Sequence, residues 1–341
     1  MTEFLLPYVE IFRVPRAWRF SVAGVIGRMP MSMFGLGTVL LISAGTGRYG
    51  VAGSVSAAGS LALAACAPQI ARLADSRGQY RVLIPLVGVF AVSVAGLITA
   101  VQLRAPDWAL FASGTAAGAT MPLLGSMVRA RWSALLAGSP RLHTAFSFES
   151  VADELCFVIG PAAVTLLATE IHPAAGVGAA ALLCLVGTLW FAAQRDTEPP
   201  VVGSPLVAGT PPADISPERT GVTGQGRRRL LAAPSLVVLI PVYLFLGGMF
   251  VTIDLSTVAF AAHFGHKPLA GLILGCYALG SGTGGLWYGS RTWKAPVARR
   301  FACTLTLTVA GVCTFWAMPN LLLLAAVIYL CGLTIAPTLI A

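Results

Sequence analysis

The sequence predicts an all-α polytopic membrane protein, and three observations carry that prediction. Of the 341 residues, 57% are hydrophobic and only 10% are charged, and the mean hydropathy is +0.82. A soluble domain averages about 25% charged residues, so the composition excludes an ordinary soluble protein. Long apolar stretches recur along the chain, and nearly all basic residues fall into every second connection between them. Because lipid offers the backbone no hydrogen-bond partners, we expect these stretches to be helices.

Ten apolar stretches are long enough to cross a bilayer, which takes about 20 residues of helix. They are continuously apolar and do not alternate, which disfavours a membrane β-barrel. We expect the spans near Phe20–Ser43, Tyr49–Ile70, Val82–Val101, Ala109–Met127, Ala145–Ala168, Ala174–Ala193, Pro234–Ala262, Pro268–Tyr288, Phe301–Met318 and Leu321–Ala341.

The basic residues predict which way the chain faces. Of the 22 Lys and Arg residues, eighteen precede the first span or follow an even-numbered span, three lie in the opposite connections, and Arg28 lies inside a span. The positive-inside rule then places the N-terminus in the cytoplasm and the protein in the cytoplasmic membrane. The net charge of +9 therefore needs no nucleic-acid partner. The eighteen are Arg13, Arg16, Arg19, Arg72, Arg77, Arg81, Arg129, Arg131, Arg141, Arg195, Arg219, Arg227, Arg228, Arg229, Arg291, Lys294, Arg299 and Arg300.

The longest polar interruption predicts a division of the chain. Gln194–Ala233 is rich in proline and glycine and holds an arginine triplet, which is typical of a flexible cytoplasmic linker. We therefore expect an N-terminal six-helix bundle over 1–193, a linker over 194–233 and a C-terminal bundle over 234–341.

The two bundles resemble each other at a constant offset. Ala52-Gly53 in the second span aligns with Ala270-Gly271 in the eighth, and a basic turn follows both. Two six-helix repeats in parallel form a known transporter architecture. Because the second bundle holds four predicted spans against six in the first, we expect counterparts of the fifth and sixth spans beyond Ala341.

A loop motif follows the second span. The sequence ARLADSRGQYR, Ala71–Arg81, resembles the loop signature G-x-x-x-D-R-x-G-x-R-R of the major facilitator superfamily. Asp75, Gly78 and Arg81 match, whereas Ala71, Ser76 and Tyr80 depart from it. The glycine allows a tight turn, and the arginines, Arg77 included, can pair with Asp75 or with helix ends. We expect either a cytoplasmic latch that breaks during transport or a plain topology loop.

A second motif lies in the fifth span. In IGPAAV, Gly160 and Pro161 match the Gly-Pro core seen in the superfamily's proton-coupled exporters, and Ala162 and Ala163 replace the glycines that normally follow. Pro161 removes a backbone hydrogen bond and bends the helix, as a hinge or as a static kink.

The resemblance covers the whole chain and implies a secondary active transporter that moves a small organic molecule by alternating access. Proton-coupled efflux is the first expectation. An uptake symporter of the same fold, or a non-transporting fragment or sensor, is the alternative. The expected partners are the small-molecule substrate, protons and the lipid bilayer, and the expected state is a monomer.

Ionisable residues inside the spans are candidates for function, because a membrane makes them costly. Glu149 and Asp153 share a face of the fifth span, and Glu154 is adjacent. Arg28 lies at a similar depth in the first span, so we expect it to pair with Asp153 or Glu154. Three roles are open for these groups: a structural ion pair that fixes helix packing, a proton-coupling or substrate site, or charged groups that face a cytoplasmic vestibule. Asp254, in the seventh span, is a candidate gate or a solvated edge residue.

Other chemistries find little support in the sequence. There is no Walker loop, HExxH or GxSxG motif, so we expect no enzyme, cofactor or metal site. GSGTGG, Gly280–Gly285, has dinucleotide-motif spacing but lies within an apolar span, where small residues allow close helix packing. The seven cysteines all lie in spans and are expected to be apolar filling. Tryptophans near span ends, Trp132 among them, are expected to be interfacial anchors.

Cysteine labelling tests the predicted topology. In a background without the native cysteines, Ser204→Cys in the linker should react with an impermeant thiol reagent only from the cytoplasm, because the basic loops are retained there. Asp107→Cys should react only from outside. Equal reactivity of the two positions from outside would refute the topology.

Overall fold

The computed structural model describes residues 2–201 and most of 269–340, together with isolated positions between 241 and 265. Within these residues the secondary structure is helical and no strand occurs. Six helical segments of the described chain are long and apolar enough to cross a membrane, in agreement with the predicted fold class. They are Ala17–Thr46, Tyr49–Arg77, Gln79–Gln102, Arg141–Ile171, Ala175–Ala193 and Leu321–Ile340.

Other predicted spans form helices that are shorter or less apolar than these six. The eighth forms α12, Ala270–Gly289, whose many glycines dilute its hydropathy. The ninth forms α13, Val297–Val312, which has only 16 residues. The seventh, with Asp254, and most of the linker lie outside the described residues.

Prolines divide the first and fourth predicted spans. The first consists of α2, Ala17–Arg28, and α3, Pro30–Thr46. Pro30 has no amide proton to donate to the Ile26 carbonyl, which accepts from Met29 at 3.4 Å instead. The fourth is broken into α6, Asp107–Thr120, and α7, Leu124–Leu135, by Met121 and Pro122. Met121 is extended, with ψ 121°, because the proline ring that follows disfavours the helical conformation.

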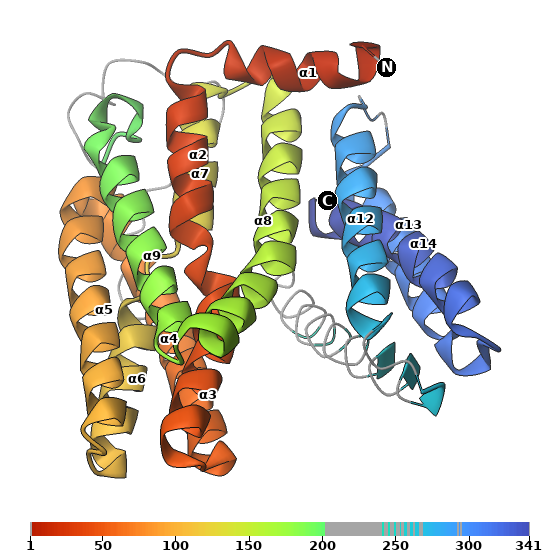
Figure 1. Ribbon diagram of the computed structural model, residues 1–341. Coiled ribbons are helices and arrows are strands. Elements are labelled where there is room, and N and C mark those ends of the chain that lie inside the picture. The colour runs from red at the N-terminus through yellow and green to blue at the C-terminus, as the bar shows by residue number, and fades with distance from the viewer. Residues whose placement is uncertain are drawn as a thin grey trace.

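The helices of residues 17–193 stand side by side (Figure 1). Besides those above they include α4, Tyr49–Arg77, α5, Gln79–Gln102, α8, Arg141–Leu166, and α9, Ala175–Ala193. A short π-helix, η1, Leu167–Ile171, extends α8. Close packing joins α2 to α9, α4 to α6, and α3 to α4 and α8.

The N-terminal helix α1, Thr2–Phe12, lies across one end of these helices (Figure 1). We call this the α1 end of the molecule. Ile11 is fully buried there, and the ring of Phe12 packs edge-on against those of Trp132 and Phe148. Glu10 also pairs with Arg141, at 3.2 Å, so α1 is fixed to the start of α8.

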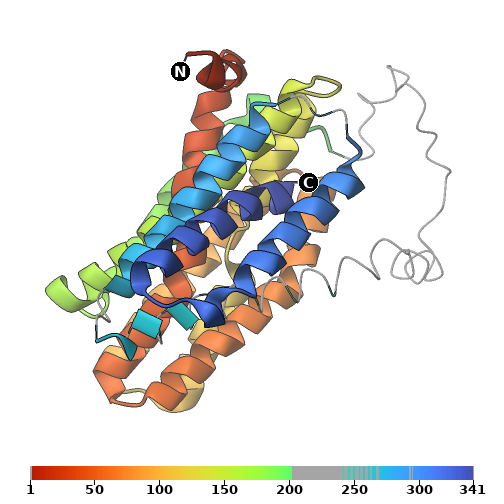
Figure 2. The ribbon, with the colours of Figure 1, turned by 90° about the vertical axis from the view of Figure 1, so that its right-hand side faces the viewer.

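The C-terminal helices form a separate layer. In Figure 2, α14, Leu321–Ile340, lies between α12 and α13, and α12 in turn packs against α8. Gly280 and Gly284 bring α12 against the backbone of α14: a β-carbon at Gly284 would lie 2.7 Å from the Leu333 carbonyl carbon. The glycine-rich stretch is therefore a packing surface, as the sequence predicts.

Candidate functional site

Four charged side chains from three helices meet in one network, which we call the charge network: Arg28, Arg129, Glu149 and Asp153. Arg28 donates from Nη1 to Asp153 Oδ1 at 2.9 Å and from Nη2 to Glu149 Oε2. Arg129 donates from Nη2 to Asp153 Oδ2 at 2.7 Å. The Asp153 carboxylate is therefore shared by two arginines, and Arg28 is shared by two carboxylates.

The proline breaks place these residues. Arg28 is the last residue of α2, just before the break at Pro30, and Arg129 lies in the half-helix that follows the break at Pro122. Glu149 and Asp153 are one turn apart on α8, so both face the arginines. Arg28 and Asp153 lie about 16–18 Å along their helices, which is far from either helix start. Charged groups beside broken helices are typical of transporter binding sites.

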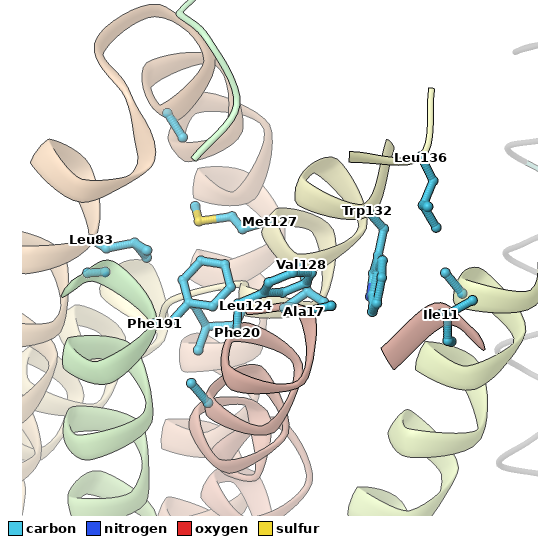
Figure 3. Close-up of a cluster of buried hydrophobic side chains, with 14 of the residues drawn as sticks. Ile11, Ala17, Phe20, Leu83, Leu124, Met127, Val128, Trp132, Leu136 and Phe191 are labelled. Carbon is cyan, nitrogen blue, oxygen red and sulfur yellow. The ribbon is translucent and has the colours of Figure 1, made fainter. Parts of the chain in front are cut away.

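Glu149 is sealed from solvent. Its side chain is 0% exposed, and its Oε1 accepts from Ser21 Oγ at 2.6 Å and from Trp132 Nε1 at 2.9 Å. Trp132 belongs to a buried cluster at the α1 end, packed edge-on against Phe20 and close to Ile11 of α1 (Figure 3). Both oxygens of Glu149 thus have protein donors, and no water has access to them. Glu149 acts as a fixed counter-ion of Arg28.

Asp153 and Arg129 form the accessible side of the network. Their side chains are 21% and 34% exposed, whereas that of Arg28 is 1% exposed. The exposed part of the network therefore consists of Asp153 and Arg129, whereas Arg28 and Glu149 are enclosed. The neighbouring carboxylates of Glu149 and Asp153 therefore differ in exposure, since only that of Asp153 is partly open.

The other predicted residues of the fifth span lie outside this network. Glu154 makes no ion pair with either arginine, and its half-buried carboxyl is turned toward Ser281 of α12. Gly160 lies against α3, where Ser32 Oγ donates to the Cys156 carbonyl at 2.7 Å. Pro161 stays within α8, which bends in its lower part in Figure 1.

The loop motif adopts the predicted turn but not the predicted pairing. Gly78 has φ 90°, a conformation that other residues rarely adopt. Asp75 is exposed and makes no ion pair with any described residue. Arg77 and Arg81 line an open cavity of about 410 Å³, together with Arg195 and Glu198, whose Oε1 accepts from the Tyr80 amide at 3.0 Å. A carboxylate from the linker region thus binds the backbone of the loop motif at Tyr80.

Three residues near the network differ from their sequence predictions. Arg129 and Arg131 were predicted as topology charges in a loop, but both lie in α7, and Arg131 is buried. Arg131 donates to Gln79, Thr197 and the Gln194 carbonyl and stacks on Phe191. Trp132 is fully buried and is no interfacial anchor. The one feature of the sequence that marks this break is Pro122, two residues before α7 begins at Leu124.

Comparison with known proteins supports a single family. The profile of the Major Facilitator Superfamily matches residues 20–341, which include the charge network and helices α12 to α14. No curated protein sequence matches the chain significantly.

Removing Arg28 tests the energetics of the network. Arg28→Ala should lower the free energy of unfolding by about 3–5 kcal/mol, because it leaves Glu149 buried without a cation. Adding Glu149→Gln should restore part of this loss, since no lone charge then remains. Thermal denaturation in detergent measures both, with exposed Arg104→Ala as the control. A double variant no more stable than Arg28→Ala would contradict the pairing.

Proposed function

Because the chain belongs to the major facilitator superfamily, we propose that it is a proton-coupled transporter of a small organic solute, with Asp153 as the proton-carrying group. Members of this family are secondary transporters. The observation that carries the proposal is the geometry of Asp153: a carboxylate deep in a membrane helix, bound by two arginines and partly exposed. A carboxyl group of this kind can be charged or neutral, and its hydrogen bonds with Arg28 and Arg129 are strong only in the charged form.

The other acidic candidates suit this role less well. Glu149 is sealed by Ser21 and Trp132, so a proton has no route to it. Glu154 contacts no arginine, so its protonation would not be transmitted to α2 or α7. Asp153 links α2, α7 and α8 through one carboxylate, and its neutralisation weakens all of these links.

Alternating access requires contacts that form and break, and the α1 end supplies a set of them. Tyr8 of α1 donates to the Leu286 carbonyl at 2.7 Å, Thr144 of α8 donates to the Gly289 carbonyl at 3.0 Å, and the His143 ring lies 3.3 Å from the Tyr288 carbonyl. These carbonyls belong to the last turn of α12, and those of Leu286 and Tyr288 also accept from the backbone amides of Ser290 and Arg291. By the charge asymmetry we assign the α1 end to the cytoplasm. We propose that this α12 C-terminal contact closes the cytoplasmic side.

Two directions of coupling compete. The Gly160–Pro161 core supports proton-coupled efflux by resemblance to the exporters. The charge network supports the alternative, co-transport of solute and proton, because protonation of Asp153 frees two arginines. A non-transporting sensor would need neither an accessible carboxylate nor a separable contact at the α1 end.

Transport in proteoliposomes tests the role of Asp153. With an imposed pH gradient and a panel of labelled organic solutes, the intact protein should couple solute flux to proton flux. Asp153→Asn should abolish the coupled proton flux and preserve solute exchange, because the asparagine cannot carry a proton. Glu154→Gln is the matched control and should remain coupled. Unchanged coupling in Asp153→Asn would move the proton site to another group, such as Asp254.

Gly289 tests the closed contact. A β-carbon there would overlap Ser147 of α8 and lie 2.7 Å from the Tyr8 hydroxyl, so Gly289→Ala should destabilise closure. Reaction of Ser126→Cys, an exposed position in α7, with a thiol reagent added from the cytoplasm should become faster. Gly282→Ala on the same helix serves as the control, because a β-carbon at Gly282 would have no atom within 4 Å. Equal rates in both variants would show that the contact does not govern access.

A further inference from the structure

We propose that the transported solute is an organic anion, which binds Arg129 and Arg28 while Asp153 carries a proton, so that anion and proton move in the same direction. This inference deepens the proposed function and rests on it. It follows from the donors of the network, from the half-helix beside it and from the charge balance.

The two arginines have donors to spare. Toward the described residues, Arg129 donates only from Nη2, to Asp153, and a third of its side chain is exposed. Arg28 is buried, yet its Nε has no hydrogen-bond partner within the described part of the chain. A guanidinium presents five N–H donors in a fork that suits a carboxylate. When Asp153 is neutral, the donors that it held become available to another anion.

The start of α7 adds a positive end to the same place. Gly125 lies in its first turn, and a β-carbon built there would be 3.9 Å from both Arg28 Nη1 and Asp153 Oδ1. The first amide groups of a helix lack intrahelical acceptors and carry partial positive charge. Helix starts of this kind face anionic groups of substrates in transporters with broken helices. Gly125 has no side chain to block that approach.

The charge balance selects an anion over a cation. Asp153 is faced by Arg28 of α2, Arg129 of α7, and Glu149, Glu154 and Cys156 of α8 among the described residues. The charge network itself, two arginines and two carboxylates, is neutral. Protonation of Asp153 leaves an excess of one positive charge, which a monovalent anion cancels. A cation at Asp153 would have to displace both arginines and then lie beside them.

This balance fixes the sense of coupling. Protonation of Asp153 strengthens anion binding, and by linkage the bound anion strengthens protonation by the same factor. The loaded state therefore holds both, and the empty state holds neither. An inward proton gradient would then drive uptake of the anion, which favours the symporter over the exporter suggested by Gly160 and Pro161.

Binding of benzoate, benzamide and benzylammonium to the purified protein tests the inference without a transport assay. Asp153→Asn mimics the protonated carboxyl, so at mildly alkaline pH it should bind benzoate at least about tenfold more tightly than the wild type, a difference of about 1.4 kcal/mol. Adding Arg129→Gln should remove the gain. Glu154→Gln, which alters a neighbouring carboxyl without an arginine contact, should behave as the wild type.

The opposite results would overturn the anion site. Benzoate affinity that is equal in the wild type and Asp153→Asn, or that survives Arg129→Gln, would contradict it, as would preferential binding of benzylammonium to the wild type. Such results would leave proton coupling through Asp153 intact, because coupling is judged separately by proton flux in proteoliposomes. If instead benzoate bound as predicted but Asp153→Asn remained proton-coupled in proteoliposomes, the proposed function of Asp153 would be wrong.

Discussion

The buried pair of Arg28 and Glu149 is the interaction around which the site is arranged. Both charged side chains are buried, so each depends on the other and on added hydrogen bonds. Ser21 and Trp132 donate the remaining hydrogen bonds to the Glu149 carboxylate. The carboxylate is therefore fixed, and it orients the Arg28 guanidinium so that Nη1 faces Asp153. The buried carboxylate of Glu149 thus determines, through Arg28, where the partly exposed carboxylate of Asp153 is bound. The packing of Trp132 between α1 and α2 in turn holds Glu149 in place.

The prolines explain why charges can lie at this depth. Pro30 and Pro122 interrupt helices within the predicted spans, and each break leaves backbone groups that a continuous helix would satisfy. Arg28 and the start of α7 lie beside these breaks, so polar backbone and charged side chains gather together. A set of straight helices would have kept each charge isolated in an apolar environment.

The sequence was sufficient for the all-α membrane fold, and it named three of the four residues of the charge network as candidates, all but Arg129. Arg28 and Asp153 could be matched because depth follows from residue count along a helix. Glu154 could not be separated from Asp153 by depth, although successive residues point about 100° apart, and only the packing of α8 against α2 and α12 decides between them. Arg129 was missed because a basic residue after an apolar stretch normally marks a loop. The predicted span ended at Met127, whereas α7 continues as a helix to Leu135 and so includes Arg129.

The hydrogen bond between Tyr8 and Leu286 joins residues 278 positions apart, and this has a consequence for biogenesis. The helix α1 leaves the ribosome before its acceptor at the end of α12, which is made 278 residues later. At about 5–20 residues per second, the interval is about 15–60 s. During that time Tyr8 has no Leu286 to bind, and α1 is held by its apolar contacts and by the ion pair between Glu10 and Arg141. The first helix to be synthesised therefore reaches its final set of bonds only when the eighth predicted span has been inserted.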